Sequence, residues 1–381
     1  MKFTITQKEL AILQEKSKLF SYLSSAMTKT YFGVGDGKFV VFFRGVKGAA
    51  KLVLSAPEAT ETVRVFQIDY AKWLNAIAKQ SFADEITITL TEKYLKVSIE
   101  GSSDMISLGI TPYEESSSEA EVLQTFIEAN KLEGNELVLT EELADTISVA
   151  TSMLSAAAHN NAIALNADSV MYADRSIVFQ AKLQESIAAL AGRGSVDLHK
   201  YTVGFLVWAM KFNNVFHFSD DFQQVYWVSD SGDGCMTVLL TSEPCEIAIP
   251  TAEELQAIQP AGETGSMVID HRELAYALEF FNGFYEASVW KPITFTLSAS
   301  GASKLYYKHP TTEISKELDA KVTLDCDFAL SSENMSKILN RSIALTENKP
   351  LDVQFTYDDD AAGVRCVIGD YFDVVFAKLI S

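Results

Sequence analysis

The sequence predicts an α+β protein of three similar domains, each built from two copies of one strand–helix–strand–strand unit. Three observations predict this architecture. A strand pattern, an amphipathic helix and further alternating strands recur in the same order six times along the chain. A polar stretch and a group of prolines divide the 381 residues into three nearly equal lengths. In addition, a single core rarely grows beyond about 250–300 residues, so a chain of this length is expected to hold several domains.

The clearest copy of the repeat lies in the first third of the chain. Residues 65–68 alternate like a strand, and residues 69–79 place Trp73 and Ile77 at helical spacing. Its later strands are expected at 85–90 and 94–99, and the opening copy has a strand at 2–5, a helix at 7–23 and strands at 31–34 and 39–44.

The other four copies keep the same order of elements. The third has a strand at 137–139, a helix at 141–153 and strands at 162–166, 169–173 and 176–180. The fourth has a strand at 195–198 and a helix at 199–210, and the fifth a strand at 267–270 and a helix at 272–281. The sixth has a strand at 328–330, a helix at 332–339 and strands at 351–355 and 364–368.

Two breaks in the pattern mark the expected domain boundaries. Residues 111–121 are polar, have no hydrophobic period and are typical of a linker. Prolines at 244, 250 and 260 mark the second break. The predicted domains are residues 1–120, 121–250 and 251–381.

Composition limits the kinds of protein this chain can be. Apolar residues make up 48% of it, enough for a core in every domain. No apolar run approaches the roughly 20 residues of a membrane helix, and the first residues lack a signal-peptide pattern, so we expect a cytoplasmic protein with no membrane partner. The formal net charge of −20 argues against a protein that coats nucleic acid with its whole surface.

The residues that often carry chemistry are scattered. The four cysteines lack the spacing of metal ligands, and the five histidines lie in different repeats, so we expect no metal, no cofactor and no enzyme activity. Asp69, Asp197 and Asp270 occupy equivalent strand-to-helix positions, which favours three helix N-caps over catalytic carboxylates. Residues 358–360 are expected to form a hairpin turn, and residues 33–37 lack the lysine of a phosphate loop.

Basic residues gather on the predicted helices. Four of the six helices carry two or more, although lysine and arginine decorate many exposed helix faces for solubility alone. In a chain this acidic, their clustering favours a face that attracts an anion. The residues are Lys8, Lys16, Lys18, Lys72, Lys79, Lys200, Lys211, Arg272, Lys337 and Arg341.

The repeat order and three segments resemble a known family. Residues 1–5 with the helix after them, residues 65–77, and the strand pair at 169–178 are similar to the bacterial-type DNA sliding clamps, the beta subunits of replicative DNA polymerases. The family has Thr-Asp-Gly-His-Arg-Leu in the last segment, whereas here Asp174 and Arg175 are adjacent and the Gly-His pair is missing. A divergent phage-encoded member is one interpretation that stays open.

The resemblance implies a DNA-clamp fold and a mechanical function. Two chains would close head to tail into a homodimeric ring, with helices lining the interior and sheets forming the outside. The ring would encircle double-stranded DNA without reading its sequence, in the nucleoid or at a replication site, and the basic helix residues would line the hole. It would tether a DNA polymerase, and a clamp-loader ATPase is a further partner that the family suggests.

The resemblance also implies a hydrophobic cleft for partner peptides. Four positions come from the middle strands, two from the domain connection and three from the C-terminal segment. They are Tyr172, Ala173, Arg175, Ile177, Pro250, Leu255, Phe376, Leu379 and Ile380. A plain edge strand is the alternative for the last three.

Two other functions remain open at this stage. A phage structural or assembly protein could use the same repeats to form an oligomer without DNA inside. A hydrolase with a divergent acidic site is the third candidate. If Lys72, Lys79, Lys200 and Lys337 point to one concave surface, the clamp is favoured, whereas scattered orientations favour the assembly protein.

Overall fold

The computed structural model describes most of the chain as two compact units. The described residues are 1–23, 29–61, 63–78, 84–99, 103–112, 125–154, 162–174, 176–229, 234–242, 250, 252–260, 262–282, 284, 291–309 and 312–379. Unit 1 comprises Met1–Thr140 and Tyr201–Pro244, and unit 2 comprises Glu141–Lys200 and Cys245–Ser381. The expected middle domain, residues 121–250, contributes to both units. The division into three domains therefore stays a prediction.

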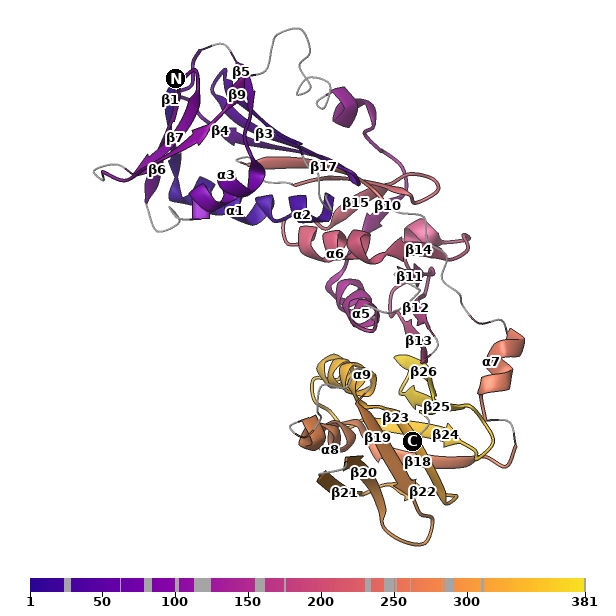
Figure 1. The fold of residues 1–381 in the computed structure, drawn as a ribbon. Coiled ribbons are helices and arrows are strands. Elements are labelled where there is room, and N and C mark those ends of the chain that lie inside the picture. The colour runs from indigo at the N-terminus through magenta and orange to yellow at the C-terminus, as the bar shows by residue number, and fades with distance from the viewer. Residues whose placement is uncertain are drawn as a thin grey trace. The chain divides into compact units, whose positions relative to one another are not determined.

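Unit 1 contains two antiparallel sheets (Figure 1). One has the strand order β1-β6-β7-β8 and the other β10-β15-β16-β17-β4-β3-β2-β5-β9. The strands of the first are β1 (Lys2–Thr6), β6 (Glu85–Leu90), β7 (Tyr94–Ile99) and β8 (Met105–Gly109). Those of the second are β2 (Lys29–Gly35), β3 (Lys38–Gly45), β4 (Gly48–Ser55), β5 (Arg64–Gln67), β9 (Thr111–Pro112), β10 (Glu136–Val138), β15 (Val215–Phe218), β16 (Gln224–Val228) and β17 (Cys235–Thr241).

The helices of unit 1 pack through an aromatic core. Trp73 is fully buried, and its ring lies 5.1 Å from that of Phe32 and 5.7 Å from that of Phe39. Tyr22 lies directly against Gly204, where a β-carbon would come within 2.8 Å of the ring, so a small residue is needed at this helix contact. The helices are α1 (Gln7–Ser17), α2 (Phe20–Leu23), α3 (Tyr70–Ala78) and α6 (Lys200–Ala209, in this unit from Tyr201).

Unit 2 repeats the design with its own two sheets. Their strand orders are β14-β11-β12-β13-β26-β25-β24-β18-β22 and β21-β20-β19-β23. The first sheet has β11 (Ala162–Leu165), β12 (Ser169–Ala173), β13 (Ile177–Lys182), β14 (Val196–His199), β18 (Gly265–Asp270), β22 (Lys321–Val322), β24 (Asp352–Tyr357), β25 (Gly363–Ile368) and β26 (Phe372–Ala377). The second has β19 (Pro292–Leu297), β20 (Ser303–His309), β21 (Thr312–Leu318) and β23 (Cys326–Ser331).

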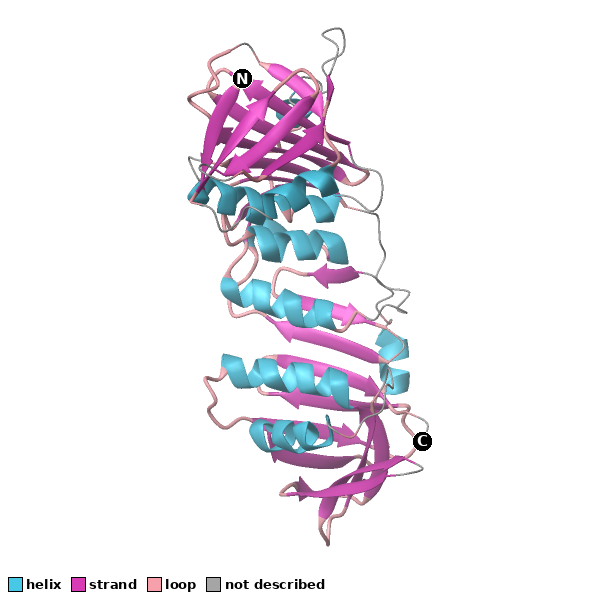
Figure 2. Ribbon diagram, turned by 60° about the vertical axis from the view of Figure 1, so that its left-hand side comes forward, coloured by secondary structure: helices cyan, strands magenta, loops and turns pink. Residues whose placement is uncertain are grey.

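Helices α8 and α9 lie side by side in unit 2 (Figure 2). His271 joins them from a fully buried position, with Nδ1 2.9 Å from the Ser342 hydroxyl and Nε2 2.9 Å from the Lys349 carbonyl oxygen. Phe295 packs between Phe328 and Phe355 beneath the helices, with ring centres 5.1 and 5.7 Å away. The helical elements are α5 (Glu141–Ser152), η1 (Ala188–Leu190), α7 (Ala252–Ile258), α8 (His271–Asn282) and α9 (Ser332–Leu345).

The local predictions are confirmed with a few corrections. The helix expected at 7–23 is two helices, because the backbone turns at residues 18–19 between α1 and α2. Asp69 caps α3 by accepting the Lys72 N–H at 3.0 Å, and Asp270 caps α8 by accepting the Arg272 N–H at 2.8 Å. The cap predicted at Asp197 is wrong, because this residue lies inside β14 and the helix begins only at residue 200. Residues 358–360 connect the paired strands β24 and β25, as expected.

Candidate nucleic-acid interface and peptide cleft

Unit 1 presents exposed lysines along its helices. Lys8 lies in the first turns of α1, Lys18 directly follows that helix, and Lys72 lies in α3. Lys211 lies just beyond the end of α6. Helix α1 contacts α2 and α3, and α2 packs on α6, so the helices that carry or adjoin these four lysines form one connected group. Exposed lysines of this kind can attract phosphate groups without base contacts.

Lys16 does not belong to this exposed set, which corrects the prediction for this residue. It is 1% exposed, and its ammonium group donates to the Ser229 hydroxyl at 2.9 Å and to the Gly234 carbonyl at 2.5 Å. The group also lies 5.2 Å from the centre of the Phe212 ring. Burial lowers the pKa of the Lys16 ammonium below its usual value. Its spacing of three residues from the buried Leu13 is the signal that could have placed it on the inner face.

The basic residues of unit 2 are held by neighbours in the same unit. Lys337 forms an ion pair with Glu333 at 3.0 Å and donates to the Ser152 carbonyl at 2.7 Å. Arg341 is 13% exposed and pairs with Asp145 of α5 at 2.7 Å. These two side chains therefore join α9 to α5.

Arg272 is also engaged within its own unit. Its guanidinium group meets the Asp270 carboxylate through two contacts of 3.0 Å and donates to the Asn348 carbonyl at 3.2 Å. Lys200 is half-buried where the chain passes from unit 2 to unit 1, and Lys79 lies outside the described residues. It is therefore not decided whether the four lysines named above for this test point to one concave surface. The assignment of the pore-lining residues stays a prediction.

Four of the predicted cleft residues lie on neighbouring strands of the large sheet of unit 2. Ile177 of β13 is the direct neighbour of Phe376 of β26, and Tyr172 and Ala173 lie on the adjacent strand β12. All four are at most 2% exposed, so they form the sheet and its core and do not offer an accessible lining. Pro250 and Leu379 are half-buried. Arg175, Ile380 and the side chain of Leu255 lie outside what the structure describes.

Three members of the apolar cluster around Ala173 were missed by the sequence analysis, namely Val178, Val375 and Ile258. Ile258 of α7 packs on Ala173, Val178 and Val375, so the connecting helix covers this part of the sheet. A β-carbon on Gly363 would come within 2.5 Å of the Ile258 carbonyl oxygen, which shows how closely the helix end approaches β25. Apolar residues at this helix end were the available signal.

Asp174 joins the end of β12 to the start of β13 at the segment where the Gly-His pair is missing. Asp174 accepts hydrogen bonds from the Tyr172 hydroxyl at 2.7 Å and from the N–H groups of Ser176 at 2.7 Å and Ile177 at 3.0 Å. One carboxylate therefore closes the β12–β13 turn, as aspartate does in many short turns. Burial and the nearby carboxylate raise the pKa of the Tyr172 hydroxyl.

The described part of the chain contains neither a cluster of metal ligands nor a helix suited to a membrane. Among these residues, no three or more His, Cys, Asp or Glu side chains are placed to hold a metal ion. Within the same ranges, no helix has the length and apolar character needed to cross a membrane.

The repeated helix-and-strand units on antiparallel sheets define an α+β protein with the DNA-clamp fold. Neither the protein-family models nor the curated proteins contain a match to this sequence. Solved structures do match. The DNA polymerase III beta subunit from Thermotoga maritima has a TM-score of 0.71 and 14% identity, over 100% of this chain and 99% of that one.

Two other solved structures extend the comparison. The DNA polymerase III subunit beta from Pseudomonas aeruginosa has a TM-score of 0.70 and 13% identity, with 100% of both chains covered. The Helicobacter pylori beta clamp bound to a DNA ligase peptide has a TM-score of 0.68 and 12% identity, again over 100% of both chains. Identities this low establish the fold that the chains share, over their whole length.

Proposed function

We propose that the protein is a DNA sliding clamp, a non-enzymatic ring that encircles duplex DNA and tethers a DNA polymerase. The observation that carries the proposal is the whole-length likeness to clamp structures, with 99–100% of those chains covered. Because a clamp acts through topology, it needs geometry and a weak attraction for phosphate, with no reactive site.

The charge distribution supports this function. The chain has a formal net charge of −20, which disfavours indiscriminate binding to nucleic acid. Lys8, Lys18, Lys72 and Lys211 are nevertheless exposed in or next to helices of unit 1, and we assign them to the surface that would face the duplex. Weak, salt-sensitive contacts of this kind hold a duplex without fixing its register, so they allow sliding.

The ring would be a homodimer closed by two edge strands. Within the described residues, no strand pairs with the outer edge of β8 in unit 1 or of β21 in unit 2. Beside β21, Tyr276 and Phe280 are 65% and 45% exposed, and the Lys316 ammonium lies 4.7 Å from the Tyr276 ring centre. Pairing of β8 with β21 of a second copy would use both edges and cover these rings.

Partners would dock on the large sheet of unit 2. The Helicobacter pylori clamp carries a ligase peptide, and the corresponding proposal here is an apolar peptide from a polymerase or another replication protein. The half-buried residues Pro250 and Leu379 would contact it, beside helix α7, which covers the buried cluster of Ala173, Val178 and Val375. A loader ATPase and an intracellular replication site belong to the same proposal.

The first test measures the salt dependence of DNA binding. Reversing Lys8, Lys18, Lys72 and Lys211 to glutamate should weaken binding of a labelled short duplex at least tenfold at low salt. The slope of log K against log salt should fall by about one for each phosphate group that is no longer neutralised. Fluorescence anisotropy over a salt series measures both quantities.

The matched control reverses four lysines that lie outside the helices of unit 1. These residues are in strands or in the turn between two strands, and their reversal changes the net charge by the same amount; they are Lys2, Lys38, Lys93 and Lys96. This control should bind the duplex more tightly than the first variant does. Its slope of log K against log salt should stay close to the wild-type value. Equal losses in both variants, or no duplex binding by the wild-type protein, would contradict the proposal and favour an assembly protein without DNA.

A further inference from the structure

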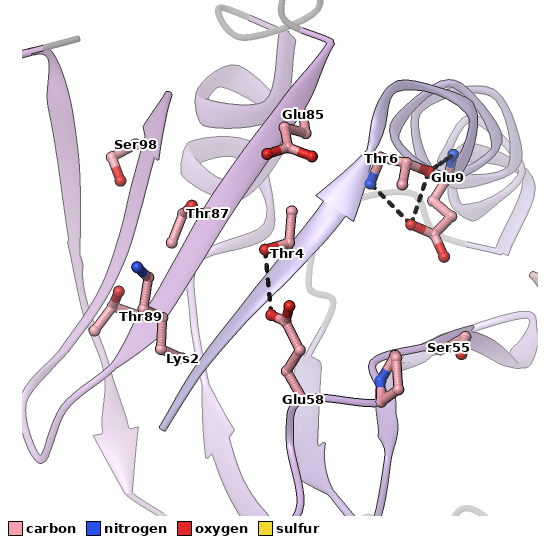
Figure 3. A pocket seen from close by; sticks show the side chains of 11 residues that line it. Lys2, Thr4, Thr6, Glu9, Ser55, Glu58, Glu85, Thr87, Thr89 and Ser98 are labelled. Atoms are coloured by element: carbon pink, nitrogen blue, oxygen red, sulfur yellow. Dashed lines mark hydrogen bonds between the residues drawn. The ribbon is translucent and has the colours of Figure 1, made fainter. Parts of the chain in front are cut away.

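A polar groove lies on unit 1 between β1 and the segment that follows β4 (Figure 3). Its volume is about 940 Å³. Hydroxyl groups cover its floor, from Thr4 on β1, Thr87 and Thr89 on β6 and Ser98 on β7. The carboxylates of Glu58 and Glu85 lie on either side, and the Glu58 carboxylate accepts a hydrogen bond from the Thr4 hydroxyl at 3.2 Å.

The backbone of β1 faces this groove along its outer edge. Met1 and Leu90 exchange two hydrogen bonds, of 3.1 and 2.8 Å, and Gln7 donates to Asp84 at 2.7 Å. Because hydrogen-bonded pairs alternate in an antiparallel ladder, the N–H and C=O groups of Lys2 and Thr4 point away from β6. Among the described residues, no backbone group pairs with them.

In the sixth repeat, the strand equivalent to β1 has a hydrogen-bonded segment on its outer edge. Strand β23 precedes α9 as β1 precedes α1, and it pairs with β19 as β1 pairs with β6. Counting back from the first residue of each helix makes Ala329 the equivalent of Thr4. The outward carbonyl of Ala329 accepts the Leu379 N–H at 2.8 Å. In this repeat, the chain's own C-terminal segment therefore lies on the edge that is open at Thr4.

Two other strands of this type are also covered. The short strand β9 pairs with β5, and the short strand β22 pairs with β18. Both covered strands precede a helix, as β1 does. Among the helix-preceding strands, β5 and β18 therefore carry a short extended segment on this edge, whereas β10 and β14 have no strand there within the described residues.

Charge indicates the kind of segment that would fit at β1. Glu9, Glu58 and Glu85 line the groove, against a single lysine, Lys2. Glu9 is already used in the cap of α1, where it accepts the Thr6 N–H at 2.8 Å. Glu58 is exposed and its described partner is a neutral hydroxyl, so a cation would replace that contact with a charge-assisted one.

We infer that the β1 groove binds an extended, lysine- or arginine-bearing segment of a partner protein by strand addition. Main-chain hydrogen bonds to Lys2 and Thr4 would supply affinity, and the Glu58 carboxylate would select a basic side chain on the added segment. This site belongs to unit 1 alone and uses neither the basic helices nor the sheet of unit 2. Its existence does not depend on the proposed function.

The test uses the full chain and a labelled peptide of alternating lysines and threonines. Fluorescence anisotropy should show saturable binding, and a peptide with glutamate in place of lysine should bind at least tenfold more weakly. The variant Glu58→Lys should lose at least tenfold in affinity. The control Glu92→Lys changes an exposed carboxylate in the β6–β7 turn, outside the groove, and should bind as the wild type does.

Hydrogen exchange identifies the mode of binding. The peptide should slow exchange at residues 2–6, because strand addition engages the outward amides of β1. The proposal is overturned if the lysine peptide shows no saturable binding at millimolar concentration, or if the Glu58→Lys variant and the wild type bind it equally. Binding without slower exchange in β1 would overturn strand addition as well.

Discussion

At the scale of single residues, Asp270 shows how one carboxylate can begin a helix and hold a cation. It accepts the Arg272 N–H and meets the guanidinium group of the same residue through two contacts of 3.0 Å. Arg272 holds the pKa of the Asp270 carboxyl below its ordinary value of 3.8. The sequence analysis expected the cap, and only the structure reveals the ion pair that comes with it.

Replacing Asp270 should separate the cap from the ion pair. Asp270→Asn keeps a capping oxygen and should lower the free energy of unfolding by about 0.5–1 kcal/mol, the range of a partly exposed ion pair. Asp270→Ala also loses the cap and should cost about 1–2 kcal/mol. Because the folded pKa lies below 3.8, the wild-type advantage should be complete above that pH and shrink as the pH falls further.

Urea unfolding between pH 7 and pH 3 measures this advantage. Asp69→Asn is the matched control, because Asp69 caps α3 through a backbone N–H of similar length, with no ion pair of its own among the described residues. Asp69→Asn should lower the free energy of unfolding at pH 7 by less than Asp270→Asn does. An Asp270→Asn difference that stays constant down to pH 3 would contradict the ionic contribution.

At the scale of elements, the pairing of β4 with β17 joins segments that are far apart in the chain. Gly48 begins β4 with φ +152°, next to Leu239 and Leu240 of β17. A β-carbon at Gly48 would lie 2.1 Å from the Leu239 carbonyl oxygen. Backbone atoms cannot move aside as a side-chain end can, so the joint between these strands requires glycine.

Gly48→Ala should therefore destabilise unit 1 strongly. We expect a loss of about 2–4 kcal/mol, since the clash can be relieved only by separating β4 from β17. Gly109→Ala is the control, because nothing lies within 4 Å of a β-carbon at that position in β8. It should change the free energy of unfolding by less than about 0.5 kcal/mol. Similar stabilities of the two variants in urea unfolding would contradict the role of this close approach.

At the scale of the whole molecule, strand edges and exposed rings point to association between copies. Large exposed aromatic side chains beside an unpaired edge are unusual in a monomer. Tyr276 and Phe280 lie on α8, which contacts β21, and the Lys316 ammonium lies 4.7 and 5.5 Å from their ring centres. A second copy would remove these groups from water.

The mass of the native particle tests this association. Light scattering coupled to size exclusion should give twice the chain mass of 42.0 kDa. Tyr276→Glu/Phe280→Glu places two charges in the expected interface and should give single chains at micromolar concentration. Val46→Glu changes a side chain that is 75% exposed in the β3–β4 turn and should leave the mass unchanged. A wild-type protein that is monomeric at every concentration would contradict the homodimer.

Whether a sequence prediction was correct depends on how far apart in the chain the interacting residues lie. The strands at 85–90 and 94–99 and the caps at Asp69 and Asp270 follow from local periodicity and turn chemistry, and all are confirmed. Lys16 was misplaced, because its burial depends on Ser229 and Gly234, more than 200 residues away. Arg341 was expected on a DNA-facing surface, whereas its pairing with Asp145 depends on the contact between α5 and α9.

The sequence by itself determined the repeated strand-and-helix units, because hydrophobic period and capping act over a few residues. It also determined the acidic balance of the chain and the basic helices. Only the tertiary structure decided which strands became neighbours, as in β4 with β17 and β13 with β26, and which cations remained exposed. It alone left the outer edge of β1 without a backbone partner among the described residues, while Leu379 bonds to the equivalent edge of β23. Those outcomes depend on contacts between distant segments, which no local pattern encodes.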